Sequence, residues 1–275
     1  YKAEQYTPYE QAMQSRNNYS VYASYEKNFD EKNTLALSAR ESWTTGAPND
    51  YNNTNFSGQV QYTHKLAEDT NLYASIGQSY KMPDLHQIYK TKAGADLKAQ
   101  TGMHYELGLK KDFDDFRKAR IALFSYKVKD NITAKYDEKL GDFTYENEDL
   151  KNTGIEAEYS MSADKGFGYS LSASYSSPKT RNMKKGVVGD WERDYAKLYL
   201  KAGLTYRMDK FSAALNAAYT GDRVLSDKDT TPSLITNFNA EYQMTKNGSV
   251  FLTVNNILDR EDISYRSSSA EYYYT

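Results

Sequence analysis

The sequence predicts an all-β protein, a transmembrane antiparallel β-barrel of which this chain supplies about twelve complete strands. Three observations predict it: a strict alternation of apolar and polar side chains, long strands, and connections that are short and long in turn. In such a barrel each strand turns one set of side chains towards lipid and the other towards a wet interior.

The alternation is clearest in residues 195–207, which read YAKLYLKAGLTYR. Leu198, Leu200 and Leu204 share one face of a strand, whereas Lys197 and Lys201 share the other. A helix would spread both sets around its circumference, but a strand separates them at a period of two. The same pattern predicts strands at residues 17–29, 33–45, 54–66, 71–82, 103–113, 117–129, 143–162, 167–177, 195–208, 210–221, 232–244 and 248–259.

The length of these segments favours a membrane protein. Strands of globular proteins usually have about five or six residues, whereas a tilted strand needs about 9–11 to cross a bilayer. The chain has no run of about 18 apolar residues, so a membrane-spanning helix is not expected. A soluble β-sandwich or lectin would also alternate, but strands of this length are rare there.

The connections give an independent sign of the same fold. Short turns are expected at 30–33, 67–70, 113–118, 163–166, 207–210 and 245–248, and long connections at 45–54, 83–102, 130–144, 178–194, 222–231 and 260–270. Outer-membrane barrels have short periplasmic turns and long extracellular loops, so the alternation assigns the two ends of the strands. Residues 1–16 are then expected in an extracellular loop, and the final AEYYYT is expected to begin another strand.

Composition excludes several classes of protein. The net charge is -2, without the basic excess that usually marks nucleic-acid binders. The 27 tyrosines suit a membrane interface, because a tyrosine is apolar at one end and polar at the other. The chain has no cysteine, no metal-binding spacing and no catalytic motif, so we expect neither an enzyme nor a bound cofactor or metal.

Four short motifs occur in a fixed order along the chain. The first is Tyr80, Lys81, Met82 and Pro83, followed by Leu85 and Tyr89. The others are YELGLKKDF at 105–113, NTGIEAEYS at 152–160 and VNNILD at 254–259. Together they resemble the TonB-dependent receptors of the Gram-negative outer membrane. Two departures from the family pattern are Met82, where alanine is usual, and Ala99-Gln100, where Pro-Glu is usual.

The resemblance implies a barrel of about 22 strands. Residues 1–275 would be its C-terminal portion, with the plug domain and the N-terminal strands absent from this chain. It also implies active uptake of a scarce nutrient, a ferric siderophore or similar iron chelate, driven by the TonB complex through the missing plug. A haem or cobalamin receptor of the same family, or a passive porin or surface-binding barrel, are the alternatives.

The resemblance and the residue types suggest three groups of site residues. The box at 80–83 is expected to be structural, with Tyr80 at the headgroup level and Pro83 where the strand leaves the ladder. Aromatic and basic loop residues could contact an anionic chelate, or be an ordinary polar rim; they are Tyr51, Tyr145, Trp191, Arg193 and Arg223. His86 could ligate haem, as a minor alternative. Residues expected to face the lumen or the plug are Lys197, Lys201, Arg207, Glu156 and Glu158.

Overall fold

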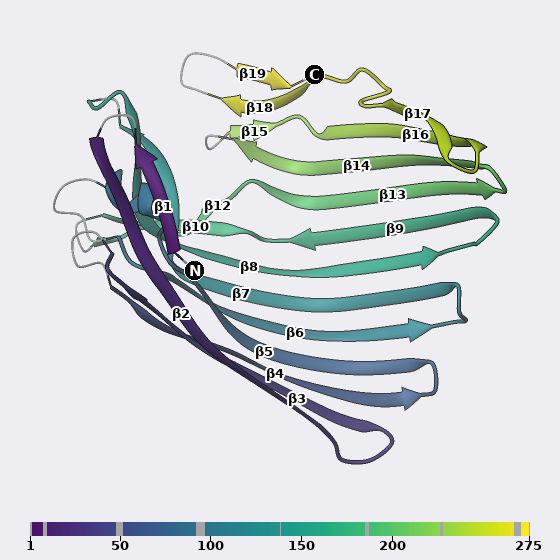
Figure 1. The fold of residues 1–275 in the computed structure, drawn as a ribbon, viewed down its shortest axis with the longest axis horizontal. Helices are drawn as coiled ribbons and strands as arrows, with labels where there is room; N and C mark the ends of the chain where they lie inside the picture. Colours follow the sequence, from purple (N-terminus) through teal and green to yellow (C-terminus); the bar gives the residue numbers. More distant parts are fainter. Residues whose placement is uncertain are drawn as a thin grey trace.

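The computed structural model describes residues 2–7, 10–47, 52–91, 97–137, 139–184, 187–225, 228–266 and 271–274. Most of these residues lie in antiparallel strands, and Figure 1 shows the long strands side by side in one strongly curved sheet. In this described part, twelve strands form the main ladder: β2 (Glu10–Asn28), β3 (Asn33–Thr45), β4 (Thr54–Ala67), β5 (Thr70–Lys81), β6 (Gln100–Asp112), β7 (Arg117–Asp137), β8 (Asp142–Met161), β9 (Gly166–Ser176), β13 (Ala196–Met208), β14 (Phe211–Leu225), β16 (Ser233–Thr245) and β17 (Gly248–Val254).

Each strand of this series pairs with the next, as the sequence predicts. All six predicted short turns are present. The last predicted strand is too long, because the ladder stops at Val254 instead of continuing to residue 259. Asn256 and Asp259 there adopt φ values of 50° and 47°, which an extended strand does not allow.

The two faces of the sheet differ as the alternation predicts. Leu200 and Leu204 of β13 are 39% and 44% exposed, although both are large and apolar. They lie on the convex face, together with Leu123 of β7 and Ile155 of β8, so this face carries a band that only lipid would cover. Leu200 and Lys201 are consecutive on β13, and the lysine therefore points to the opposite, concave face.

An aromatic belt follows the short-turn end of the convex face. The rings of Phe113, Tyr159 and Tyr169 lie in contact, with centroids 6.1 and 5.7 Å apart. Farther along the sheet, Phe167 contacts Tyr206 at 4.8 Å. Aromatic side chains collect at the interfaces of membrane barrels, and this belt therefore marks the periplasmic edge of the lipid-facing band.

The long connections contain more regular structure than the sequence predicted. Strands β10 (Lys179–Lys184), β11 (Val187–Val188) and β12 (Glu192–Arg193) occupy the connection at 178–194, and β15 (Lys228–Thr230) pairs with an extended β14. Instead of a loop at 130–144, β7 and β8 continue as one hairpin beyond a bulge at Asp130, whose φ is 55°.

The two ends of the chain also differ from expectation. Residues expected in an extracellular loop form β1 (Lys2–Thr7), which pairs with the first half of β2. The tyrosine-rich C-terminal segment forms β19 (Glu271–Tyr274), which pairs with β18 (Asp262–Arg266) in a separate two-stranded sheet. Residues 271–274 thus form the expected strand, and its continuation as a barrel strand stays a prediction.

A short helix, α1 (Leu85–Tyr89), follows β5 at the long-loop end of the sheet. Asp84 is its N-cap, and a reciprocal capping box joins Asp84 to Gln87. Leu85 and Ile88 lie on one side of the helix and are 3% and 8% exposed. No helix in the described residues has the length and apolarity to cross a membrane.

Candidate functional site

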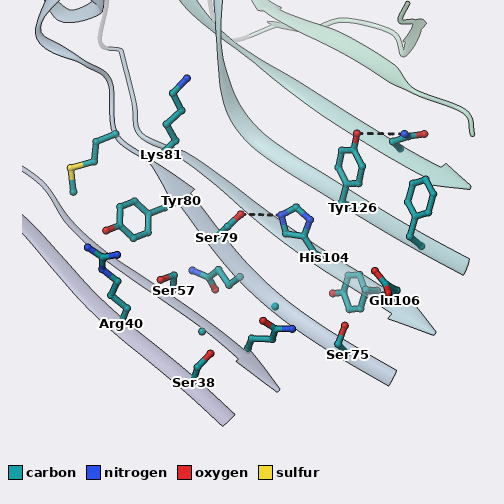
Figure 2. A pocket seen from close by; sticks show the side chains of 18 of the residues that line it. Ser38, Arg40, Ser57, Ser75, Ser79, Tyr80, Lys81, His104, Glu106 and Tyr126 are labelled. Carbon is teal, nitrogen blue, oxygen red and sulfur yellow. Dashed lines mark hydrogen bonds between the residues drawn. The ribbon is translucent and has the colours of Figure 1, made fainter. Parts of the chain in front are cut away.

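A cavity of about 1490 Å³ lies on the concave face, towards the ends of β2–β9 and β13 that carry the long connections. Its wall is rich in small polar side chains, because successive strands present serines or glutamines at their inward positions (Figure 2). Ser38, Ser57, Ser75 and Ser79 are examples. A wall of short hydroxyl side chains leaves room inside the barrel and can hydrogen-bond water or a polar ligand.

Three cations line the part of this cavity nearest the long connections: Arg16, Arg40 and Lys81. Arg40 donates to Ser20 Oγ at 2.9 Å and to Ser42 Oγ at 3.2 Å. Among the described residues, no carboxylate lies at ion-pair distance from Arg40 or Lys81, and both side chains are exposed to the cavity. Unpaired cations on the wall of a cavity favour an anionic ligand.

Arg16 holds the motif at 80–83 in place. Its Nη1 donates to the carbonyl oxygen of Pro83 at 2.5 Å, while its Nε is buried without a hydrogen-bond partner. Burial lowers the pKa of Arg16, and the charge of Asp84 partly opposes that shift. The Nε of Arg16 is therefore a buried donor whose hydrogen-bonding capacity is not satisfied within the described residues.

The motif itself divides between structural and cavity-lining residues. Pro83 is fully buried and Leu85 is 3% exposed, in agreement with a structural role. Tyr80, Lys81 and Met82 line the cavity, and Figure 2 draws the Tyr80 ring between the Arg40 and Lys81 side chains. Tyr80 thus borders the cavity, and its expected position at the headgroup level stays a prediction.

A charge network crosses the wall deeper in the barrel. Arg120 of β7 binds Glu106 at 2.7 Å and also Glu156, and its Nε donates to the Tyr73 hydroxyl at 2.8 Å. Tyr73 in turn donates to Glu106. Gly108 makes this arrangement possible, because a Cβ there would lie 2.5 Å from Cζ of Tyr73. The glycine of the YELGLKKDF motif thus admits a tyrosine from the neighbouring strand.

The expected lumen residues fall into two sets. Glu156 belongs to the network around Arg120, and Lys197 pairs with Asp222 at 3.2 Å. Lys201, Arg207 and Glu158 are exposed on the concave face. A contact between any of them and a plug stays a prediction.

His86 and Tyr145 lie together above the cavity. His86 Nδ1 is 3.4 Å from the Tyr145 hydroxyl, and the rings meet edge to face at 5.7 Å. Lys90 at the end of α1 pairs with Asp142 of β8, and this hydrogen bond holds the pKa of Asp142 below its usual value. Haem ligation by His86 stays a prediction.

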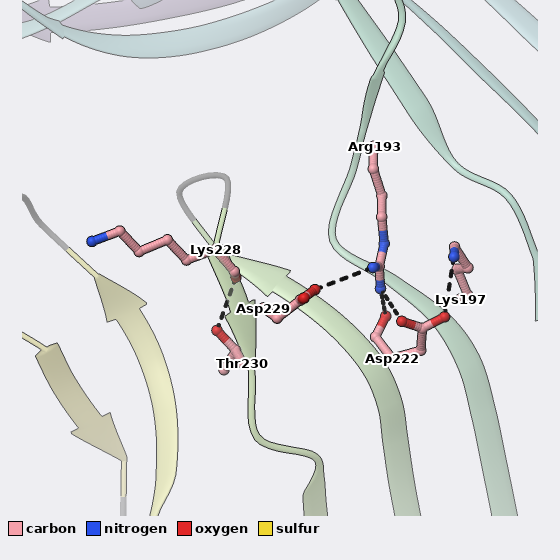
Figure 3. Close-up of polar contacts among 6 residues, drawn as sticks. All are labelled: Arg193, Lys197, Asp222, Lys228, Asp229 and Thr230. Carbon is pink, nitrogen blue, oxygen red and sulfur yellow. Dashed lines mark hydrogen bonds and ion pairs between the residues drawn. The ribbon is translucent and has the colours of Figure 1, made fainter.

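The basic loop residues predicted to contact ligand are engaged with carboxylates. Arg193 binds Asp222 at 2.5 Å and Asp229 at 3.4 Å (Figure 3). Lys197 donates to the same Asp222, and this hydrogen bond is the main reason why the pKa of Asp222 is lowered. Arg193 therefore ties the segment before β13 to β14 and β15.

Arg223 and Trp191 are also held by the chain. Arg223 is 2% exposed and binds Asp262 at 2.5 Å and the Ile263 carbonyl oxygen at 2.8 Å, so it anchors β18. Its burial leaves no surface for a ligand. The Trp191 ring lies between Lys151 and Arg181, at 4.0 and 4.6 Å. Tyr51 lies outside the described residues, and Tyr89 is half-buried in α1.

The sequence analysis missed Arg16, Arg40, Tyr73, Glu106 and Arg120 as parts of the wall. For four of them the alternation along the strand was an available signal. Arg40 follows Ala39, and Arg120 precedes Ile121; since these apolar neighbours face lipid, the two arginines must face the interior. Arg16 had no such signal, because it lies in the part of β2 that was expected to be a loop.

A model of the family described as TonB dependent receptor-like, beta-barrel matches residues 2–257. The chain belongs to this family. Such barrels reside in the bacterial outer membrane, and the convex apolar band is accordingly the lipid-facing surface of this one.

Individual relatives are distant. The chain is 25% identical over 203 residues to a vitamin B12 transporter, BtuB, of Vibrio vulnificus, a match that covers 73% of this chain and 32% of that protein. Among solved structures, the copper transporter OprC gives a TM-score of 0.71 at 20% identity, over 90% of this chain and 43% of that one. The ferripyoverdine receptor of the Pseudomonas aeruginosa outer membrane gives 0.71 at 18% identity, over 95% and 37%. These structures share the fold, and the chain spans less than half of each.

Proposed function

We propose that this chain is part of a TonB-dependent active transporter that takes up an anionic metal chelate, of the ferric siderophore class, across the outer membrane. The chain would be the C-terminal portion of the barrel, and other parts of the full protein would supply the plug and the contact with TonB. The barrel would carry out no chemical reaction, and selectivity would come from the shape and charge of the cavity and loops.

The cationic wall of the cavity carries this proposal. Arg40 and Lys81 face the cavity without a carboxylate partner, whereas the arginines of the overlying connections, Arg193 and Arg223, are each paired with aspartates. An anionic chelate that enters the cavity would therefore meet cations without a carboxylate partner at this wall. Each such contact is a charge-assisted hydrogen bond, which is stronger than a neutral one.

The architecture supports the transporter over a passive pore. The chain matches the family model over almost its whole length, and the relatives named above are transporters or receptors. Since it covers only 37% to 43% of the solved structures named, there is room in a protein of their size for a plug domain.

Cobalamin is the second candidate for the cargo, because the curated relative is a vitamin B12 transporter. Cobalamin is bulky, with a single phosphodiester charge, and its binding would depend less on Arg40 and Lys81. A haem receptor using His86 would instead depend on the His86–Tyr145 pair.

Uptake and binding by the full-length protein test the proposal. In a strain lacking the gene, we expect complementation to restore energy-dependent uptake of an iron-55 tris-catecholate complex, which is anionic. Arg40→Gln with Lys81→Gln should weaken binding of that complex by about tenfold and leave a neutral ferric tris-hydroxamate unaffected. Restored uptake of cyanocobalamin alone would replace iron with cobalamin as the cargo. Uptake that does not depend on energy would indicate a passive pore.

A further inference from the structure

On three neighbouring strands, the convex face shows the same order of residue types between the lipid-facing band and the long connections. On the convex face each presents a large apolar residue, then a hydroxyl residue two positions on, then a lysine two positions beyond. The residues are Leu123, Ser125 and Lys127 on β7, Ile155, Thr153 and Lys151 on β8, and Tyr175, Ser177 and Lys179 from β9 into β10.

The strand register brings each type into a row. Leu123 is opposite Ile155, which is opposite Tyr175, and Ser125 Oγ is 2.9 Å from Thr153 Oγ1. In the outermost row Lys127 is opposite Lys151, which is opposite Lys179. Because paired strands are about 4.8 Å apart, the backbone positions of the three lysines lie within about 10 Å, with their side chains on one face of the sheet.

The position of this row relative to the band places it at the membrane surface. Leu123, Ile155 and Tyr175 are 55%, 40% and 55% exposed, which marks them as lipid-facing. The lysines follow four residues later, about 13 Å along a tilted strand. That is the level of the headgroups at the outer leaflet, and a lysine stem can carry its charge farther still.

Among the described residues, the lysine row has no carboxylate partner of its own. In the part of the chain that the structure describes, no carboxylate is at ion-pair distance from Lys127, Lys151 or Lys179, and the nearby Asp149 is taken by Arg181 at 2.5 Å. Like charges directly opposite each other destabilise a sheet. The Lys151 ammonium lies over the Trp191 ring, 4.0 Å from its centroid.

We propose that Lys127, Lys151 and Lys179 bind the phosphate groups of lipid headgroups in the outer leaflet. A phosphate offers several acceptor oxygens and a negative charge to ammonium groups that otherwise repel each other. The site takes a lipid rather than a free anion, because the row continues directly from the apolar band, where the acyl chains of the same molecule would lie.

The experiment compares the full-length protein in nanodiscs of phosphatidylcholine alone and with added diphosphorylated lipid A. Native mass spectrometry counts the lipid A molecules that the protein retains, and thermal unfolding reports their effect on stability. The wild type should retain lipid A and gain thermal stability. The triple variant Lys127→Ser, Lys151→Ser and Lys179→Ser should lose most of both effects, and the corresponding triple arginine variant should keep them.

The control variant removes three exposed lysines at the opposite, periplasmic end: Lys32→Ser, Lys210→Ser and Lys246→Ser. It should behave as wild type. Equal lipid A retention by the row variant, or an equal loss in the control, overturns the proposal. If 50 mM inorganic phosphate in plain phosphatidylcholine discs stabilises the wild type as much as lipid A does, the site binds a free anion and the assignment to lipid is wrong.

Discussion

In the middle of the sheet, charged side chains lie on the concave face and apolar side chains on the convex face. Arg120 and Ile121 are consecutive on β7, yet the arginine joins two glutamates and a tyrosine on the concave face, whereas the isoleucine is 46% exposed to lipid. Near the end that carries the long connections, the described residues include cations without a carboxylate partner on both faces: Arg40 and Lys81 inside, and Lys127 with its row outside. The Arg120 network is therefore paired within the wall, whereas the cations at this end are available where a ligand or a headgroup can arrive.

The largest effect should come from moving a charge to the wrong face. Val60 and Gln61 are neighbours at the middle of β4, with Val60 43% exposed on the convex face. We expect Val60→Arg to lower the free energy of unfolding of the full-length protein by about 2–4 kcal/mol, because the charge lies near the bilayer centre. Gln61→Arg, the matched control in the lumen, should cost less than about 1 kcal/mol. Urea unfolding from vesicles measures both, and equal costs would erase the distinction between the faces.

The next effect tests whether the luminal network is coupled. Arg120→Met leaves Glu106 and Glu156 without their cation, and we expect it to cost about 1–3 kcal/mol. The control Arg117→Met removes the exposed pair with Asp114 in a periplasmic turn and should change stability by less than about 1 kcal/mol. If Glu106→Gln in the Arg120→Met background restores no stability, the carboxylates do not repel each other and the network is not coupled.

A glycine substitution sharpens the comparison within the same wall. Gly108→Ala places a methyl group against the Tyr73 ring, and we expect a loss of about 1–3 kcal/mol. The double variant Gly108→Ala with Tyr73→Phe should recover little, because the clash involves the ring as well as the hydroxyl. Gly108→Ala with Tyr73→Ser should recover more. Unfolding of the three variants in parallel checks this order.

The smallest effect concerns pH at the exterior. The pKa of Asp142 is below its ordinary value of 3.8, mainly because Lys90 donates to its carboxylate. At a pH above 3.8, Asp142 is charged and its contact with Lys90 stabilises the folded state. This stabilisation is lost as the pH falls through the lower pKa that Asp142 has in the folded state. Hydrogen exchange of α1 should therefore be constant from pH 7 to 5, after correction for the intrinsic rate, and rise below about pH 4. In the Asp142→Asn variant, hydrogen exchange of α1 should already be faster at pH 7 and should not change further near pH 4. If exchange in this variant also rises near pH 4, another group causes the pH dependence.

The sequence alone predicts the part of the fold that a repeated physical constraint controls. Every membrane-crossing strand must alternate, and so the ladder from β2 to β17 could be read from residues such as Leu200 and Lys201. Outside the membrane that constraint ends. The β7–β8 extension, for instance, depends on the bulge at Asp130, and a positive φ at an aspartate is not evident from residue type.

The candidate site was less predictable, because pairing decides which charges remain available. Arg193 and Arg223 looked suitable for an anionic ligand, but Asp222 and Asp262, close to them only in the fold, neutralise them. Arg40 looked like one inward residue among many. Helix α1 did carry a readable signal: Asp84 and Gln87 have capping-box spacing around the buried Leu85 and Ile88.

The central claim is that adjacent residues of one strand face hydrocarbon and water in turn, and Leu200 and Lys201 test it most directly. This chain contains no cysteine. In the variants Leu200→Cys and Lys201→Cys, a thiol-specific nitroxide label would therefore attach to this part of the full-length protein only at the introduced cysteine. In lipid vesicles, power saturation should show the label at 200 relaxed mainly by oxygen and the label at 201 mainly by a water-soluble nickel chelate. The reverse order, or equal exposure of both labels to the nickel chelate, would contradict the account.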